Sequence, residues 1–226
     1  RALEDNTTGA NNTSLGTIAL TNNTTGDDNV SIGHLAMGNN TTGSDNVAVG
    51  KGALQENTTQ SGSTAVGYQA LNSNQTASQL TAVGYQAGKN ATAGGGSSTF
   101  VGYQAGTACT GAGNTTAIGA LALSSTTTGD QNTAVGSQAL EKNTTANNNV
   151  AVGYQALEES TTAYENTFVG TISGDAITTG PQNVGIGYGA GGGVTTGASN
   201  VFVGHNSGSS ITTGNKNTIV GRYSGN

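Results

Sequence analysis

Thirteen glycines recur along the chain with a fixed 17-residue period, which a single extra residue interrupts once. A fixed period of this kind is the sequence signature of a repeat protein, and it constrains every later assignment. We number each repeat from 1 to 17 with this glycine at position 5, and we call one repeat a rung. The position-5 glycines are Gly16, Gly33, Gly50, Gly67, Gly84, Gly102, Gly119, Gly136, Gly153, Gly170, Gly187, Gly204 and Gly221.

The residue directly before each glycine, at position 4, is aliphatic in all thirteen rungs, as in Leu15, Ile32 and Val49. A β-branched residue followed by glycine is typical of a strand that bends at the glycine, where the missing Cβ permits unusual backbone angles. We therefore predict that the thirteen glycines are structural bends and that position 4 is the buried core column. Position 8 is always Ala or Ser, which predicts a tight packing contact there.

Tandem threonines mark positions 13 and 14, with Thr in twelve and eleven of thirteen rungs respectively. Threonine favours strands, so a second short strand is predicted at this pair. Adjacent strand residues face opposite sides, so one threonine column is expected inside and the other outside. Asn at position 12 and Gly at position 15 are expected to form the flanking turns. Triplets such as Asn23-Thr24-Thr25 are formal glycosylation acceptors, although turn formation is the simpler explanation for a sequence that recurs in register.

The predicted fold is all-β: a parallel β-solenoid (β-roll or β-helix) of about thirteen 17-residue rungs. No stretch shows the three-and-four apolar spacing of a helix. Residues 1–226 are expected to form a single repeat array, with a one-residue insertion near 94–97 in a turn. Rungs stacked about 4.8 Å apart would place identical side chains in Val, Thr and Asn ladders. All twelve acidic residues fall at positions 10, 11, 16 or 17, which are predicted to be solvated corners.

Each rung offers little apolar surface to bury, so association between chains is expected to add stability. The expected subunit or surface contact combines the tyrosines of position 6 with the small position 8 and the leucines of position 9. Binding specificity is expected at position 6 and at Phe100, Phe168 and Phe202 of position 3. The array is cut in mid-repeat at both ends, which favours a segment of a longer protein or head-to-tail stacking. The position-6 tyrosines are Tyr68, Tyr85, Tyr103, Tyr154 and Tyr188.

Little in the chain suggests catalysis. The net charge of −6 leaves no basic stripe for nucleic acid, and no apolar stretch is long enough to span a membrane. His34 and His205 are ten rungs apart, and the single Cys109 is expected to be a small interior residue. Acidic pairs such as Glu158-Glu159 are expected to be solvated turns and not calcium ligands. We therefore predict no catalytic residue, no metal and no cofactor, and a protein that is not an enzyme.

Segments 132–140 (Asn-Thr-Ala-Val-Gly-Ser-Gln-Ala-Leu) and 149–157 (Asn-Val-Ala-Val-Gly-Tyr-Gln-Ala-Leu) resemble repeats of phage tail-fibre proteins and related bacterial surface proteins. The Val-Ala-Val-Gly core also resembles the head repeats of trimeric autotransporter adhesins, whose repeat is shorter. The likeness spans the whole chain. It implies parallel β-rolls or β-helices assembled as homotrimers, which form shafts and receptor-binding heads. It also implies an extracellular location, at a cell surface or on a virion.

Three functions follow as hypotheses. The first is a structural fibre or adhesin segment, a stiff repetitive rod that presents a surface for attachment to a host, with a cell-surface receptor or glycan as partner. The alternative is an extracellular filament that polymerises head to tail. The third is an ice-binding solenoid, which threonine ladders favour. The adjacency of the two threonines argues against it, because only one of them faces outward.

Overall fold

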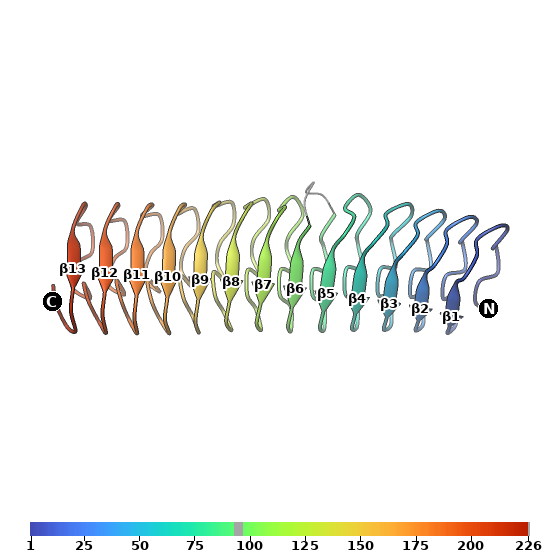
Figure 1. Ribbon diagram of the computed structural model, residues 1–226, viewed down its shortest axis with the longest axis horizontal. Coiled ribbons are helices and arrows are strands. Elements are labelled where there is room, and N and C mark those ends of the chain that lie inside the picture. Colours follow the sequence, from blue (N-terminus) through green and yellow to red (C-terminus); the bar gives the residue numbers. More distant parts are fainter. Residues whose placement is uncertain (93–96, 226) are drawn as a thin grey trace. The chain divides into compact units, whose positions relative to one another are not determined.

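The computed structural model describes residues 1–92 and 97–225, which form thirteen three-residue strands and no helix. Residues 94–96 of the segment where the one-residue insertion is expected lie outside the described residues. Contacts divide the chain into two units, Arg1–Asn114 and Thr115–Asn226, and each is considered by itself. In each unit, one strand per rung lies beside the next (Figure 1).

The strands are all parallel within each unit, and each pairs with the strand of the next rung. Paired residues occupy the same position of successive rungs, as where Val30 lies opposite Val47, and Thr81 opposite Thr99 across the longer interval. The strands of the first unit are β1 (Thr13–Leu15), β2 (Val30–Ile32), β3 (Val47–Val49), β4 (Thr64–Val66), β5 (Thr81–Val83) and β6 (Thr99–Val101). The predicted all-β parallel solenoid is confirmed.

The second unit repeats the same arrangement, again with paired residues at the same position of successive rungs. Its strands are β7 (Thr116–Ile118), β8 (Thr133–Val135), β9 (Val150–Val152), β10 (Thr167–Val169), β11 (Val184–Ile186), β12 (Val201–Val203) and β13 (Thr218–Val220). In both units the strand occupies positions 2 to 4 of the rung, directly before the glycine.

The prediction of a second strand at the threonine pair is wrong. The N–H groups of Thr24 and Thr25 both donate to the carbonyl of Thr41, at 2.8 and 3.2 Å. Successive N–H groups of a strand point in opposite directions, so two that share one acceptor require a kinked backbone. As a result neither threonine enters the interior: Thr24 is half-buried and Thr25 is exposed, whereas the flanking Asn23 and Gly26 are buried.

The interior column of the strand is position 3, so the prediction that position 4 forms the core is wrong. Ala48 is fully buried, whereas Val83 and Ile186 of position 4 are 39% and 47% exposed. Alternation in a three-residue strand turns only the middle side chain inward, and positions 2 and 4 face out together. Phe100, expected to be an exposed specificity residue, therefore has no exposed surface, and the same is true of Phe168 and Phe202.

Positions 3 and 9 share one space inside the rung. Six of the thirteen rungs place a small residue at position 3 and a leucine at position 9. Ala151 and Leu157 form one such pair, and both are fully buried. Rungs with phenylalanine at position 3 have glycine at position 9. A Cβ built on Gly174 would lie 2.7 Å from the ring of Phe168, so the ring occupies the volume that leucine fills elsewhere. Positions 8 and 9 are consequently interior, and the prediction that they form a subunit contact is wrong.

Two asparagine ladders satisfy the polar interior. In the first unit the position-12 side chains bond rung to rung: Asn40 Nδ2 donates to Asn23 Oδ1 at 2.9 Å and to the Gly43 carbonyl at 3.0 Å. In the second unit position 1 does the same, as where Asn200 Nδ2 donates to Asn183 Oδ1 at 2.9 Å. Buried amides need such partners, so the expected asparagine ladders hold the rungs that carry them in register with one another.

Candidate interaction surfaces

The position-5 glycine separates the strand from the next exposed column. All thirteen glycines have φ between +124° and +142°. Glycine is required at position 5 for two reasons, the unusual backbone conformation and the close approach of the backbone of the next rung. A Cβ on Gly50 would lie 2.4 Å from the carbonyl oxygen of Gly67 in the next rung, closer than any side chain tolerates. The chain therefore turns sharply after position 4, and position 6 projects from a different edge of the rung.

The tyrosines predicted as a contact surface are all on the surface. Their exposed fractions run from 38% for Tyr68 to 52% for Tyr103. In the first unit the structure brings three of them together: Tyr85 stacks on Tyr68 and on Tyr103, with ring centroids 5.1 and 5.4 Å apart. In the second unit Tyr188 stacks on His205, at 5.0 Å. Tyr154 is 48% exposed.

A glutamine ladder runs beside the tyrosine stack of the first unit. Gln86 Nε2 donates to Gln69 Oε1 at 3.0 Å, and Gln104 Nε2 donates to Gln86 Oε1 at 2.9 Å. These residues occupy position 7, next to the tyrosines in sequence. Aromatic stacking and amide hydrogen bonds together hold the three rungs in one alignment, so this patch is a preorganised aromatic and amide surface.

The outer face of each sheet is a second surface, which sequence reasoning missed. It consists of positions 2 and 4, because both project away from the interior. Position 2 is Thr or Val in every rung, position 4 is Leu, Ile or Val, and neither position carries a charge. Ile118 and Val169 are each 39% exposed. The signal was present in the sequence: position 4 stays uniform while position 3 varies in size, as expected if position 3 is adjusted to interior packing.

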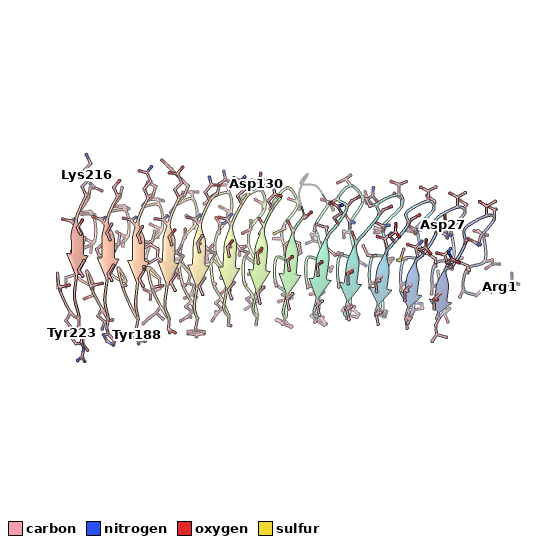
Figure 2. The ribbon with its side chains drawn as sticks, in the orientation of Figure 1. Arg1, Asp27, Asp130, Tyr188, Lys216 and Tyr223 are labelled. Carbon is pink, nitrogen blue, oxygen red and sulfur yellow. The ribbon has the colours of Figure 1, made fainter. Side chains whose placement is uncertain are left out.

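The outer face of the second unit lies between two different edges. Figure 2 shows Lys216 beyond one end of the strands, and Tyr188 and Tyr223 beyond the other. Lys216 belongs to position 17, a corner column that carries Asp28 and Asp45 in the first unit. The sheet face is therefore an uncharged strip between a polar corner and the column of position 6.

The acidic corner of the second unit gathers five charged residues at positions 10 and 11. Lys142 forms an ion pair with Glu159, and this hydrogen bond raises the pKa of the lysine. Partial burial, and secondarily the neighbouring Glu141, raise the pKa of the Glu158 carboxyl. Partial burial also raises the pKa of Asp175. Across residues 1–92 and 97–225, no three His, Cys, Asp or Glu side chains are placed to hold a metal ion.

The remaining candidate residues have structural explanations. Cys109 is buried, and burial raises the pKa of its thiol to about 12, so the thiol stays protonated and unreactive near neutral pH. Asn23 and Asn143, the acceptors of formal glycosylation triplets, have no exposed surface. Their amides are hydrogen-bonded inside the rung, so the folded protein does not present them to a glycosylating enzyme.

The described residues include no helix long and apolar enough to cross a membrane. Comparison of the chain with protein-family models, with curated proteins and with solved structures gave no match. The class of protein is therefore defined by its own geometry. It is a parallel β-solenoid repeat protein, in which a variable column that includes stacked tyrosines lies beside an uncharged sheet face.

Proposed function

We propose that the chain is a structural fibre segment, not an enzyme, that acts outside the cell at a cell surface or on a virion. The observation that carries the proposal is the continuous bonding of each rung to the next within each unit. Such a stack is what the resemblance of the sequence to tail-fibre and adhesin repeats implies. Its role is mechanical: the stack transmits force and presents the same surface many times over.

The bonding between rungs extends around the whole circumference. In the first unit, Gly50 N–H donates to the Ile32 carbonyl at 2.7 Å, just after the strand. On the turn that follows, Leu54 N–H donates to the Ala70 carbonyl at 3.0 Å, and at the threonine pair Thr41 N–H donates to the Thr58 carbonyl at 2.8 Å. Each bond is worth only about 1 kcal/mol net. A load that separates two rungs must break all of them, so their number provides stiffness.

The tyrosines of position 6 are the proposed site of attachment to a cell-surface receptor or glycan. This column is exposed and it varies from rung to rung, with Lys51 and His34 as well as tyrosines. Repeated weak contacts along one column add up to avidity. The threonine pair supports an ice-binding surface less well, because the Thr41 hydroxyl donates to the Thr58 carbonyl at 3.0 Å and is used within the stack.

Single-molecule pulling on the two ends of the chain tests the mechanical role. We expect resistance to force and release in steps of one rung. Each step frees one 17-residue rung, which corresponds to about 55 Å of extended chain after the height of a rung is subtracted. Extension without steps or resistance would contradict the proposal.

Attachment is tested separately with the triple variant Tyr68→Ala, Tyr85→Ala, Tyr103→Ala and a panel of immobilised glycans and cell surfaces. The matched control is Thr25→Ala, Thr42→Ala, Thr59→Ala, because these exposed threonines lie elsewhere on the rung. We expect the tyrosine variant to lose binding by at least about tenfold and the threonine variant to keep it. Equal binding by both variants would remove position 6 as the attachment site.

A further inference from the structure

The outer sheet face is unusual for a surface that meets only water. Solvent-facing strand positions in soluble proteins commonly carry charged or polar side chains, because one face of a sheet is solvated. Here position 4 is aliphatic in all thirteen rungs, and position 2 is only Thr or Val. Ile186 is 47% exposed and Val83 39%. Contiguous apolar patches of more than a few hundred Å² on a soluble protein mark interaction sites.

The size of the face suits a protein partner. Strands about 4.8 Å apart, each spanning about 10 Å over three residues, give roughly 290 Å² of flat surface for β1–β6 and roughly 340 Å² for β7–β13. Columns at the rim add to the face of each unit, so each unit by itself offers nearly half of the roughly 800 Å² that each partner contributes to a specific interface of standard size.

The distribution of charge favours a second copy of this chain. A chain with a net charge of −6 repels its own copies, yet all twelve acidic residues lie at positions 10, 11, 16 and 17. None is on the sheet face, so two faces can meet without opposing carboxylates at the centre. Position 17 then becomes a polar rim beside an apolar contact, which is the usual anatomy of an interface.

The period and the side-chain types also match a second copy. Val and Ile are stiff at χ1, so they lose little freedom when a partner covers them. The ridges of one face repeat at the spacing of a rung, about 4.8 Å, and only a surface with that same spacing fits them along their whole length. A second sheet of this chain has the required spacing by construction.

We propose that the outer sheet face, positions 2 and 4, is the surface through which two copies of this chain pack together. The proposal rests on the fibre function and names the partner on which the fibre is built. Face-to-face packing buries the aliphatic column that one chain leaves exposed, and thereby supplements the thin interior of each rung. It also leaves the position-6 column at the edge of the contact, free for attachment.

The test uses the full chain and sedimentation velocity over a range of concentrations. Val169→Lys with Ile186→Lys places two charges on the sheet face of β10 and β11. The matched control, Thr179→Lys with Thr196→Lys, adds the same charges to exposed threonines of the same two rungs. Because all four side chains point to solvent within one chain, the circular dichroism spectrum is expected to be unchanged in both variants. We expect the sheet-face pair to weaken association at least about 100-fold and the control to leave it unchanged.

Proximity provides an independent readout. A single cysteine at Ile186→Cys, treated with a short bis-maleimide, is expected to give a covalent dimer, whereas Thr196→Cys is expected to stay monomeric. Cys109 does not interfere, because its thiol is buried in the rung.

Three results would overturn the proposal. One is a wild-type chain that stays monomeric at the highest concentration with an intact β spectrum. A second is association that both lysine variants retain equally. The third is a monomer whose thermal hysteresis in ice is abolished by the sheet-face pair, which would assign the face to ice. None of these outcomes affects the pulling experiment, because a monomer that resists force rung by rung would still support the fibre function.

Discussion

Phe168 and Gly174 provide a direct test of the shared interior space. Phe168→Ala removes a fully buried ring, a change that costs about 4 kcal/mol in free energy of unfolding. Gly174→Leu overfills the same space, because a Cβ at residue 174 would lie 2.7 Å from two ring carbons. We expect that variant to lose about 2 kcal/mol. Backbone conformation is not an obstacle, since Leu157 adopts φ of 54° at the same position of the preceding rung.

The double variant, Phe168→Ala with Gly174→Leu, recreates the combination that Ala151 and Leu157 form in the preceding rung. If the two positions share one volume, the double variant loses only about 3 kcal/mol, against about 6 kcal/mol for the sum of the two singles. The difference is a coupling energy of about 3 kcal/mol, the upper end of what contacting residues show. Part of the loss remains because the glycine at Gly185, which also accommodates the ring, stays small.

Thermal unfolding followed by circular dichroism measures the series, with about 2–4 °C of Tm per kcal/mol for a chain of this size. Repeat arrays can unfold in parts, so hydrogen exchange of peptides covering β10 provides a local measure. Additive losses, with the double variant about 6 kcal/mol below the wild type, would show that the two positions do not share a space. The coincidence of Phe with Gly in these rungs would then have another cause.

Further substitutions test the bend, the ladder and the corner. Gly50→Ala is expected to lower the free energy of unfolding by about 4 kcal/mol, because its Cβ would lie 2.4 Å from the Gly67 carbonyl oxygen at φ of 132°. Gly38→Ala is the control, because φ is not positive there. Equal losses in Tm for the two variants would contradict the structural role of the glycine bend. Ser160→Asn is expected to raise the free energy of unfolding by about 1 kcal/mol, because the buried Ser160 hydroxyl has no partner and an asparagine there would bond to Asn143. A urea midpoint of unfolding no higher than that of Ser160→Ala would contradict the stabilising role of the asparagine ladder. Burial raises the pKa values of Glu158 and Asp175 in the folded chain above their ordinary values of 4.5 and 3.8. The folded state therefore binds protons more readily than the unfolded state, and stability is expected to rise as the pH falls from neutral toward those values. The double variant Glu158→Gln, Asp175→Asn should flatten this part of the Tm profile, and an unchanged slope would exclude these two carboxyls as its source.

The fold was predictable because its period is carried by residues with no alternative. From Gly16 to Gly84 and from Gly119 to Gly204, a position-5 glycine cannot be replaced without a clash with the backbone of the next rung, so the 17-residue spacing is preserved and a solenoid follows from it. Which side of the strand faces inward was not predictable in the same way. A β-branched column such as position 4 indicates a strand, but propensity does not distinguish its two faces. Position 3 did not look like a core column, because Ala48 and Phe100 differ so much in size; their compensation lies further along the same rung, at position 9.

The tyrosine column was predictable as a surface, and its stacking follows from the parallel register. The threonine pair was not, because its two N–H groups share one carbonyl and the backbone kinks where propensity indicated a strand. The outer face was not predicted, because position 4 was assigned to the interior as the core column. Once position 3 is known to be interior, the outward direction of positions 2 and 4 follows from alternation alone.

The contrast between position 6 and the sheet face bears on why the face is uniform. Strand propensity accounts for Val, Ile and Thr at positions 2 and 4, but it does not exclude an occasional lysine or glutamate on a solvated face. Position 6 is exposed too, and it carries Lys51 and Arg222. Charge is therefore tolerated on a column just beyond the glycine bend, while none occurs on the column just before it. Interior packing cannot impose that restriction, because positions 2 and 4 point away from the interior. A contact outside the single chain can, and a surface that repeats at the spacing of its own rungs is best matched by a second copy of itself.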